Sequence, residues 1–317
     1  MATDLLLTAI RNHLDLPPTH RVTLQPLKKG GSGRDIVRLS PEGLKTYIGL
    51  HYTNERADNE KFYPVAQHLK KCGINVPEVI YHNLPKQLII LEDLGKIDLY
   101  TLKDKPFKER LPYYRLALEQ LDKLFYIRKP KDFELEPKFD AALYRWEQDY
   151  FTDHFVEGYW GKGGAPIRGS QVLYDLAENL GASARHLVHR DFQSENVIFS
   201  DNKAYLIDFQ GLRLGRQEYD LASLLWDPYM DHSDEEREEL LDIWEDISEE
   251  RPIESILRDC AIQRLMQAIG AYANLILNQR KNSYKQHLPV AAKELKALTQ
   301  DTPYQEVLHP YLDVPDA

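Results

Sequence analysis

Residues 187–196 read LVHRDFQSEN, and residues 206–210 read LIDFQ. They place Asp191 at one end of a short loop, Asn196 at its other end, and Asp208 farther along the chain. A carboxylate accepts a proton, while an amide and a second carboxylate supply the oxygen ligands that a hard cation such as Mg²⁺ requires. The pattern therefore predicts a proton acceptor beside a magnesium site.

A β-hairpin is expected to bring the two candidate metal ligands together. Residues 197–199 and 204–207 are apolar enough to form strands, and Ser-Asp-Asn-Lys at 200–203 is typical of a turn. The returning strand then carries Asp208 back beside Asn196.

A simpler interpretation makes this segment a plain hairpin whose polar residues serve its turns, with His189 as a core histidine. Turn chemistry accounts for Asp201 and Asn202. It does not account for Asp191 and Asp208, each of which lies against an apolar strand segment. The combined spacing therefore favours a site for phosphoryl transfer from a nucleotide.

Composition narrows the class of protein. The 317 residues have room for two packed units, and 43% of them are hydrophobic, as in globular proteins. No apolar run reaches the length of about 18 residues that a membrane span needs. Residues 1–14 are expected to form an amphipathic helix without a signal-peptide pattern, so a cytoplasmic location is expected.

Charge and cysteine content exclude further classes. The formal net charge of −10 argues against nucleic acid as a partner, because phosphate backbones demand a basic surface. Cys72 and Cys260 are too far apart in sequence to suggest a zinc pattern or a disulfide framework. Both are expected to be ordinary buried thiols in a reducing compartment.

The expected elements change character near residue 94. Strands are expected at 22–27, 36–39, 44–50, 76–80 and 87–91, with one helix at 64–71. Helices are expected afterwards at 107–128, 138–157, 171–180, 218–227, 234–246, 253–282 and 283–299. The sequence thus predicts an α+β, two-lobed fold, with a small β-rich lobe at 1–94, a larger mainly helical lobe at 95–317, and a ligand crevice between them.

Two segments of the first lobe are candidates for nucleotide binding. Gly31, Ser32 and Gly33 belong to a glycine turn between two expected strands, where backbone N–H groups approach phosphate oxygens closely. Glu92 and Leu94 lie where the last strand leaves the sheet, and there a hinge would offer backbone groups to adenine.

Two further groups of residues are candidates around the catalytic loop. His189 and Asp220 are expected to support the loop, with Asp220 opening a helix and reaching back by hydrogen bonds. Glu147 and Asp149, on a helix rich in aromatic residues, are candidate substrate contacts, although such a stripe is more often part of a core.

These motifs resemble the aminoglycoside phosphotransferase and choline kinase superfamily, which has the protein-kinase-like fold. HRDF at 189–192, IDFQ at 207–210 and YDL at 219–221 are similar to its bacterial branch of N-acetylmuramate/N-acetylglucosamine anomeric sugar kinases. GINVP at 73–77 and LEDLG at 91–95 match segments of the same branch. The resemblance covers roughly residues 30 to 225.

The resemblance implies an ATP-dependent small-molecule kinase. Asp191, with Arg190 beside it, would be the catalytic residue, and Asn196 and Asp208 would hold Mg²⁺. The γ-phosphoryl of ATP would move to a hydroxyl of a sugar or amino sugar, with the anomeric hydroxyl as one candidate. The sequence leaves the oligomeric state and the identity of the acceptor open.

One departure from the kinase pattern bears on the phosphates. Protein kinases carry a lysine on the third strand, and residues 46–51 contain none. Arg34, Arg38 and Lys45 are the candidate cations in its place. Without such a cation the chain would be a weak kinase, or a pseudokinase that acts as an interaction protein.

Two other kinase classes stay as alternatives. The acceptor could be an aminoglycoside, choline or ethanolamine, as elsewhere in the superfamily. A protein kinase is disfavoured by the absence of the strand lysine and of an Ala-Pro-Glu segment after Asp208.

Overall fold

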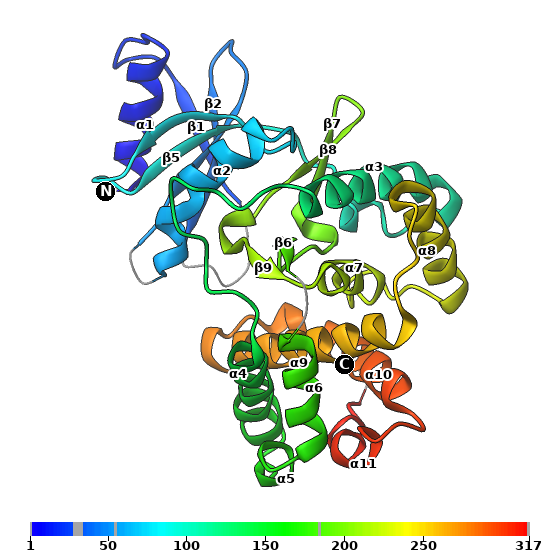
Figure 1. Ribbon diagram of the computed structural model, residues 1–317. Helices are drawn as coiled ribbons and strands as arrows, with labels where there is room; N and C mark the ends of the chain where they lie inside the picture. The colour runs from blue at the N-terminus through cyan, green and yellow to red at the C-terminus, as the bar shows by residue number, and fades with distance from the viewer. Residues whose placement is uncertain (1, 28–33, 54–55, 183–184, 316–317) are drawn as a thin grey trace.

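A computed structural model describes residues 2–27, 34–53, 56–182 and 185–315. In Figure 1 a sheet flanked by two helices occupies the upper left, and the mainly helical part extends below it and to the right. The helix α1 (Ala2–His13) comes first, and α2 (Phe62–Lys71) lies between the third and fourth strands. The predicted α+β architecture is confirmed.

The first lobe is built on one antiparallel sheet with the strand order β1-β2-β3-β5-β4. Its strands are β1 (Val22–Pro26), β2 (Asp35–Pro41), β3 (Tyr47–His51), β4 (Val79–Asn83) and β5 (Leu88–Glu92).

The two faces of this sheet are covered differently. On one face Leu39 and Ile90 pack against Leu6 and Ile10 of α1. On the other face Ile89 joins the main core, because successive side chains of a strand point to opposite faces. Burial on both faces explains the continuous apolar run in β5.

The second lobe consists mainly of helices. They are α3 (Phe107–Phe125), α4 (Ala141–Phe151), α5 (Ala165–Arg168), α6 (Gln171–Gly181), α7 (Gln217–Leu225), α8 (Asp234–Ser248), α9 (Glu254–Gln279), α10 (His287–Thr299) and α11 (Gln305–Leu308). Short strands form two ladders, β6 (His186–Val188) with β9 (Arg213–Gly215) and β7 (Val197–Ser200) with β8 (Lys203–Leu206).

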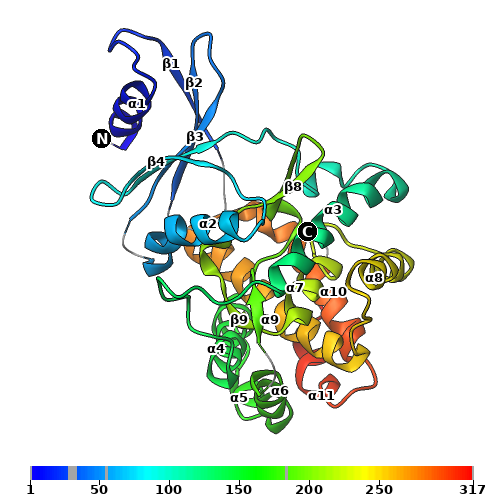
Figure 2. The same ribbon diagram turned by 45° about the horizontal axis from the view of Figure 1, so that its top comes forward.

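Helix α9 is the centre of this lobe. It contacts α4, α7 and α10, and in Figure 1 it lies between α7 above and α4 and α6 below, with Figure 2 giving a second view. Gly270 permits the contact with α4, because a Cβ there would lie 2.9 Å from the Cα of Phe151. The close crossing fixes α9 relative to α4.

Several boundaries differ from those expected. Strand β4 starts at Val79, about three residues later than predicted. The helix expected at 138–157 divides into α4 and a π-helical segment, Thr152–Tyr159. The apolar spacing did not separate the two, because the π-helical segment continues directly from the end of α4.

Two smaller expectations have separate outcomes. Cys260 is buried as expected, whereas Cys72 is exposed, because it caps the C-terminal end of α2 at the surface. None of the helices in the described parts of the chain is long and apolar enough to cross a membrane.

Candidate active site

The predicted hairpin forms and sets the two candidate metal ligands on adjacent strand ends. Val197 pairs with Leu206, and the amide of Ile207 donates to the carbonyl of Asn196 at 3.0 Å. Asp208 is the next residue along. Asn196 also donates from Nδ2 to the backbone carbonyl of Asp191 at 2.8 Å, so the loop closes on itself.

One side of the catalytic loop is held by Asp220, which is fully buried in α7. Its two carboxylate oxygens accept from the amides of His189 at 2.5 Å and Arg190 at 2.8 Å. The Nε2 atom of His189 lies 2.9 Å from the carbonyl oxygen of Ile207. Because a carbonyl can only accept, Nε2 must carry the hydrogen. Burial lowers the pKa of His189, so this ring is neutral.

The other side of the loop is held by Asp227, just beyond the end of α7. Its Oδ2 accepts from the amide of Ser194 at 2.7 Å, and its Oδ1 accepts from the amide of Tyr229 at 3.0 Å. Sequence reasoning missed this role, because no short-range pattern links Asp227 to Ser194, 33 residues earlier.

Asp191 faces open space between two guanidinium groups. Its side chain is 31% exposed, with Arg190 Nη1 at 3.9 Å and Arg264 Nη2 at 3.6 Å. Burial raises the pKa of the Asp191 carboxyl, but the positive charges of Arg190 and Arg264 outweigh it and hold the pKa below its ordinary value. The carboxylate is ionised at neutral pH and can accept a proton.

Two residues of the site adopt left-handed backbone conformations. The φ angle is +81° at Arg190 and +63° at Asp208. Such a conformation costs a residue with a Cβ about 1 kcal/mol or more, and it persists where surrounding contacts impose it. Here those contacts include the hydrogen bond of Asp220 to the amide of Arg190.

Asp208 already faces a cation. Its Oδ1 accepts hydrogen bonds from Arg34 and, at 3.1 Å, from Gln210. A guanidinium on this carboxylate shows that the position suits positive charge. The next residue, Phe209, stacks on Phe62 of α2 with ring centroids 4.8 Å apart, which links Asp208 to the first lobe.

The candidate ligands Asn196 and Asp208 suit a magnesium ion that is also bound by phosphates and water, and they do not form a complete metal site by themselves. The described residues contain no group of three or more His, Cys, Asp or Glu side chains that could hold a metal. Magnesium is commonly held by one or two protein oxygens together with substrate phosphates and water. Asn196 and Asp208 could supply such a pair. The Nδ2 group of Asn196 donates to the carbonyl of Asp191, so its Oδ1 is the atom that could bind the metal.

The three candidate cations for the phosphates differ in whether they reach the site. Arg34 reaches the site through Asp208. Arg38 does not, because its guanidinium donates to both carboxylate oxygens of Asp93, at 2.5 and 2.9 Å, and to the carbonyl of Gly95. Lys45 is exposed and lies over the ring of Tyr47. The expectation for Arg38 is therefore corrected, since it ties β2 to the hinge.

The remaining nucleotide candidates are partly described. Leu94 is buried at the hinge. Glu92 pairs with Glu78, donating from its amide at 3.0 Å and accepting with Oε1 at 2.7 Å, so these groups are already used. Gly31, Ser32 and Gly33 lie outside the described residues.

The two candidate substrate contacts differ in exposure. Glu147 is fully buried, and its carboxylate accepts from Tyr219 Oη and Gln263 Nε2 at 3.2 Å. It therefore supports the core behind the loop and does not contact the open side, a correction to the expectation. Asp149 is half-buried on the same helix.

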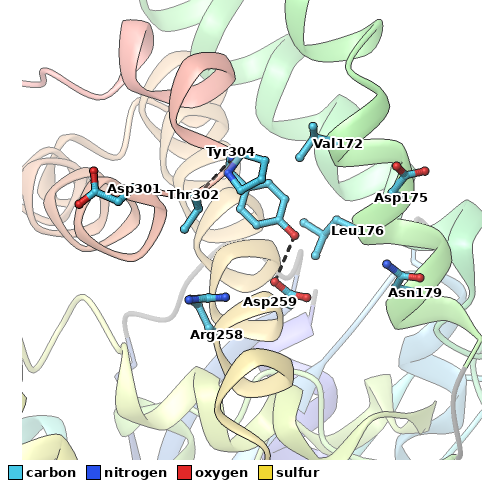
Figure 3. A pocket seen from close by; sticks show the side chains of 10 residues that line it. Val172, Asp175, Leu176, Asn179, Arg258, Asp259, Asp301, Thr302 and Tyr304 are labelled. Atoms are coloured by element: carbon cyan, nitrogen blue, oxygen red, sulfur yellow. Dashed lines mark hydrogen bonds between the residues drawn. The ribbon is translucent and has the colours of Figure 1, made fainter.

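A separate surface pocket of 420 Å³ lies away from this site, between α6, α9 and the C-terminal segment (Figure 3). Its side chains include Arg258, Asp259, Asn179 and Tyr304, and Tyr304 Oη donates to Asp259 at 3.1 Å. It contains none of the predicted catalytic residues.

Comparisons with known proteins agree with this geometry. A model described as a phosphotransferase enzyme family matches residues 23–254. The chain is 25% identical over 231 residues to an N-acetylmuramate/N-acetylglucosamine kinase of Neisseria meningitidis, covering 68% of each chain. It is 24% identical over 287 residues to a protein of the same name from Pseudomonas aeruginosa, covering 87% of this chain and 82% of the relative.

Solved structures show the same fold at lower identity. The choline kinase LicA from Streptococcus pneumoniae superposes with a TM-score of 0.65 at 15% identity, covering 92% of this chain and 99% of the other. An aminoglycoside phosphotransferase in complex with ADP and hygromycin B superposes with a TM-score of 0.60 at 16% identity, covering 93% and 98%. The kinase-like fold predicted from the motifs is confirmed.

Proposed function

The chain belongs to the phosphotransferase enzyme family, and from this premise we propose that it transfers the γ-phosphoryl group of ATP to a hydroxyl of an amino sugar. It is a phosphotransferase, and its curated relatives are named as sugar kinases. The finer proposal is that the acceptor is the anomeric hydroxyl of an N-acetylated hexosamine, in line with the resemblance stated above.

The position of Asp191 is the observation that carries the proposal. Its ionised carboxylate is partly open to solvent, while the backbone on either side of it is fixed by Asp220 and Asp227. A carboxylate held in this way accepts the proton of an acceptor hydroxyl and aligns its oxygen for attack on the phosphorus. Most of the rate enhancement then comes from positioning and charge.

Asn196 and Asp208 would hold Mg²⁺, which when bound offsets negative charge on the phosphate oxygens. Arg34 is the side chain that we assign to the phosphates in place of the strand lysine. It enters the site from the residue before β2, and it already donates a hydrogen bond to Asp208. Gly31, Ser32 and Gly33 are proposed to contribute backbone N–H groups, and the hinge at Leu94 to flank the base.

A substrate panel tests the proposal. The protein is incubated with Mg²⁺ and ATP and with N-acetylglucosamine, N-acetylmuramate, an aminoglycoside, choline or ethanolamine, and phosphorus NMR identifies the products. We expect transfer to the N-acetylated sugars, and release of the phosphate by mild acid would identify an anomeric ester. The Asp191→Asn variant is the control for contaminating kinases. Transfer to choline or an aminoglycoside alone would contradict the sugar assignment.

A further inference from the structure

We propose that Arg264, in the long helix α9, is a positioning residue that holds the carboxylate of Asp191 in its reactive orientation. The inference rests on the proposed function, because it assigns Asp191 as the proton acceptor. Arg264 lies beyond residue 254, where the match to the family model ends. It is therefore a feature of this chain that the family pattern does not define.

The guanidinium of Arg264 is anchored from behind. Nε donates to Ser223 Oγ of α7 at 2.8 Å, and Nη1 donates to Gln267, one turn along α9. The side chain is only 9% exposed, so the surrounding helices restrict it to one orientation. The two N–H donors on Nη2 of this planar group are directed at the catalytic loop.

That free edge meets two residues of the loop. Nη2 donates to Gln193 Oε1 at 3.1 Å and lies 3.6 Å from Asp191 Oδ1. Arg190 lies near the other oxygen, Oδ2, at 3.9 Å. Asp191 is thus bracketed by one guanidinium from its own loop and one from α9. The bracket restricts rotation of the carboxylate and leaves its exposed side to the acceptor hydroxyl.

A lysine cannot reproduce this arrangement. The guanidinium makes bonds in three directions from one plane, whereas an ammonium group is a point charge on a flexible stem. Charge near Asp191 would survive an Arg264→Lys substitution, but the fixed geometry would not. A misplacement of about 1 Å at a reacting group is enough to cost about 100-fold in rate.

The test compares the variants Arg264→Met and Arg264→Lys with the matched control Arg258→Met. Arg258 lies in the same helix but lines the separate surface pocket (Figure 3). We expect Arg264→Met to lower kcat by about 10- to 100-fold with KM values for ATP and the sugar within about 2-fold of wild type. Arg264→Lys should recover part of kcat, and Arg258→Met should leave both constants unchanged. Thermal unfolding checks that each variant folds.

Three results would overturn the inference. The first is an unchanged kcat in Arg264→Met. The second is a rise in the acceptor KM with kcat retained, which would make Arg264 a direct binding residue. The third is a loss of kcat in Arg258→Met equal to that in Arg264→Met. If Arg264→Met does not fold, Ser223→Ala is the second variant. It removes the anchor on Nε and should lower kcat several-fold without changing KM, and an unchanged kcat there would also overturn the inference.

Failure of the proposed function gives a different result. If the wild-type protein transfers phosphate to none of the acceptors, the proposed sugar kinase activity is refuted, but the positioning role of Arg264 is not. Crystal structures of the wild type and of Arg264→Met, or of Ser223→Ala in its place, then decide the matter. The Asp191 carboxylate is expected to turn away from its wild-type orientation in the variant, and an unchanged orientation would overturn the inference.

Discussion

The guanidinium of Arg34 donates a hydrogen bond to the carboxylate of Asp208, 174 residues farther along the chain. Arg34 lies just before β2 in the first lobe, and Asp208 lies just after the β7–β8 hairpin of the second. The contact therefore joins the two lobes at the place where phosphates and a metal ion would meet. Arg34 is thus expected both to bind the phosphates and to compete with the metal ion for Asp208, and the two effects can be measured separately.

Arg34→Gln is expected to raise the dissociation constant of Mg·ATP about 10-fold, because one charge-assisted bond to the phosphates is lost. It should also strengthen the binding of free Mn²⁺ without nucleotide, since the guanidinium no longer competes for Asp208. Calorimetry measures the first effect and paramagnetic resonance the second. Lys45→Gln, at an exposed site, is the control, and equal effects of both substitutions would contradict the assignment.

Asp191→Asn and Asp208→Asn are each expected to lower phosphate transfer by about 10²- to 10⁴-fold while the fold persists, because one removes the proposed proton acceptor and the other a proposed charged metal ligand. Initial rates and circular dichroism provide the measurement. Asp201→Asn is the matched control in the turn of the same hairpin, where Asn adopts the left-handed conformation as readily as Asp. Wild-type turnover in either active-site variant would remove its assigned role.

Asp227→Ala is expected to destabilise the protein by about 2–4 kcal/mol, because the amides of Ser194 and Tyr229 lose their acceptor in a buried place. Urea unfolding gives the free energy. Asp242→Ala, which breaks an exposed ion pair with Arg251, should cost less than about 1 kcal/mol. Similar losses in the two variants would show that Asp227 does not hold the loop.

Asp93→Asn tests the hinge through pH. Burial raises the pKa of Asp93, but hydrogen bonds from Arg38, Thr46 and the amide of Gly95 outweigh it, so the pKa is lower when folded than when unfolded. The ionised carboxylate therefore stabilises the fold above the unfolded pKa of about 4, and this contribution is lost as the pH falls through the folded pKa.

The expected cost of Asp93→Asn is about 3 kcal/mol at pH 7, because the substitution leaves the buried Arg38 without its charged partner. The difference between wild type and variant should shrink when the pH falls below about 4. Urea unfolding at both pH values measures it. A difference that does not change with pH would show that the ion pair contributes nothing.

The sequence predicted the parts of the site that depend on local spacing. The loop from Asp191 to Asn196 and the return to Asp208 follow from one hairpin, whose register is set by apolar alternation and a short turn. Asp220 was predictable in the same way, because it opens a helix directly after the hairpin. Spacing along one continuous segment fixes distances in space only over such short ranges.

Residues that reach the site from distant segments were predicted less well. Arg264 lies in an ordinary-looking helix, and only the packing of α9 against α7 and α4 brings it to Asp191. Arg38 was assigned to the phosphates as a cation near the glycine segment, and Glu147 to the substrate as a carboxylate on an aromatic helix. Each is instead paired inside the protein with a partner more than 50 residues away. Pairing of this kind depends on tertiary contacts that no local pattern records.

Both carboxylates that hold the catalytic loop belong to residues 220–227, in or just after one short helix. The proposed proton acceptor Asp191 and the proposed metal ligand Asn196 thus lie in a loop that is held by one short segment. If α7 tilted, both groups would travel together and keep their mutual spacing, while their distance from the first lobe changed. A movement of the two lobes relative to each other would then alter the fit to the nucleotide while Asp191 and Asn196 kept their spacing.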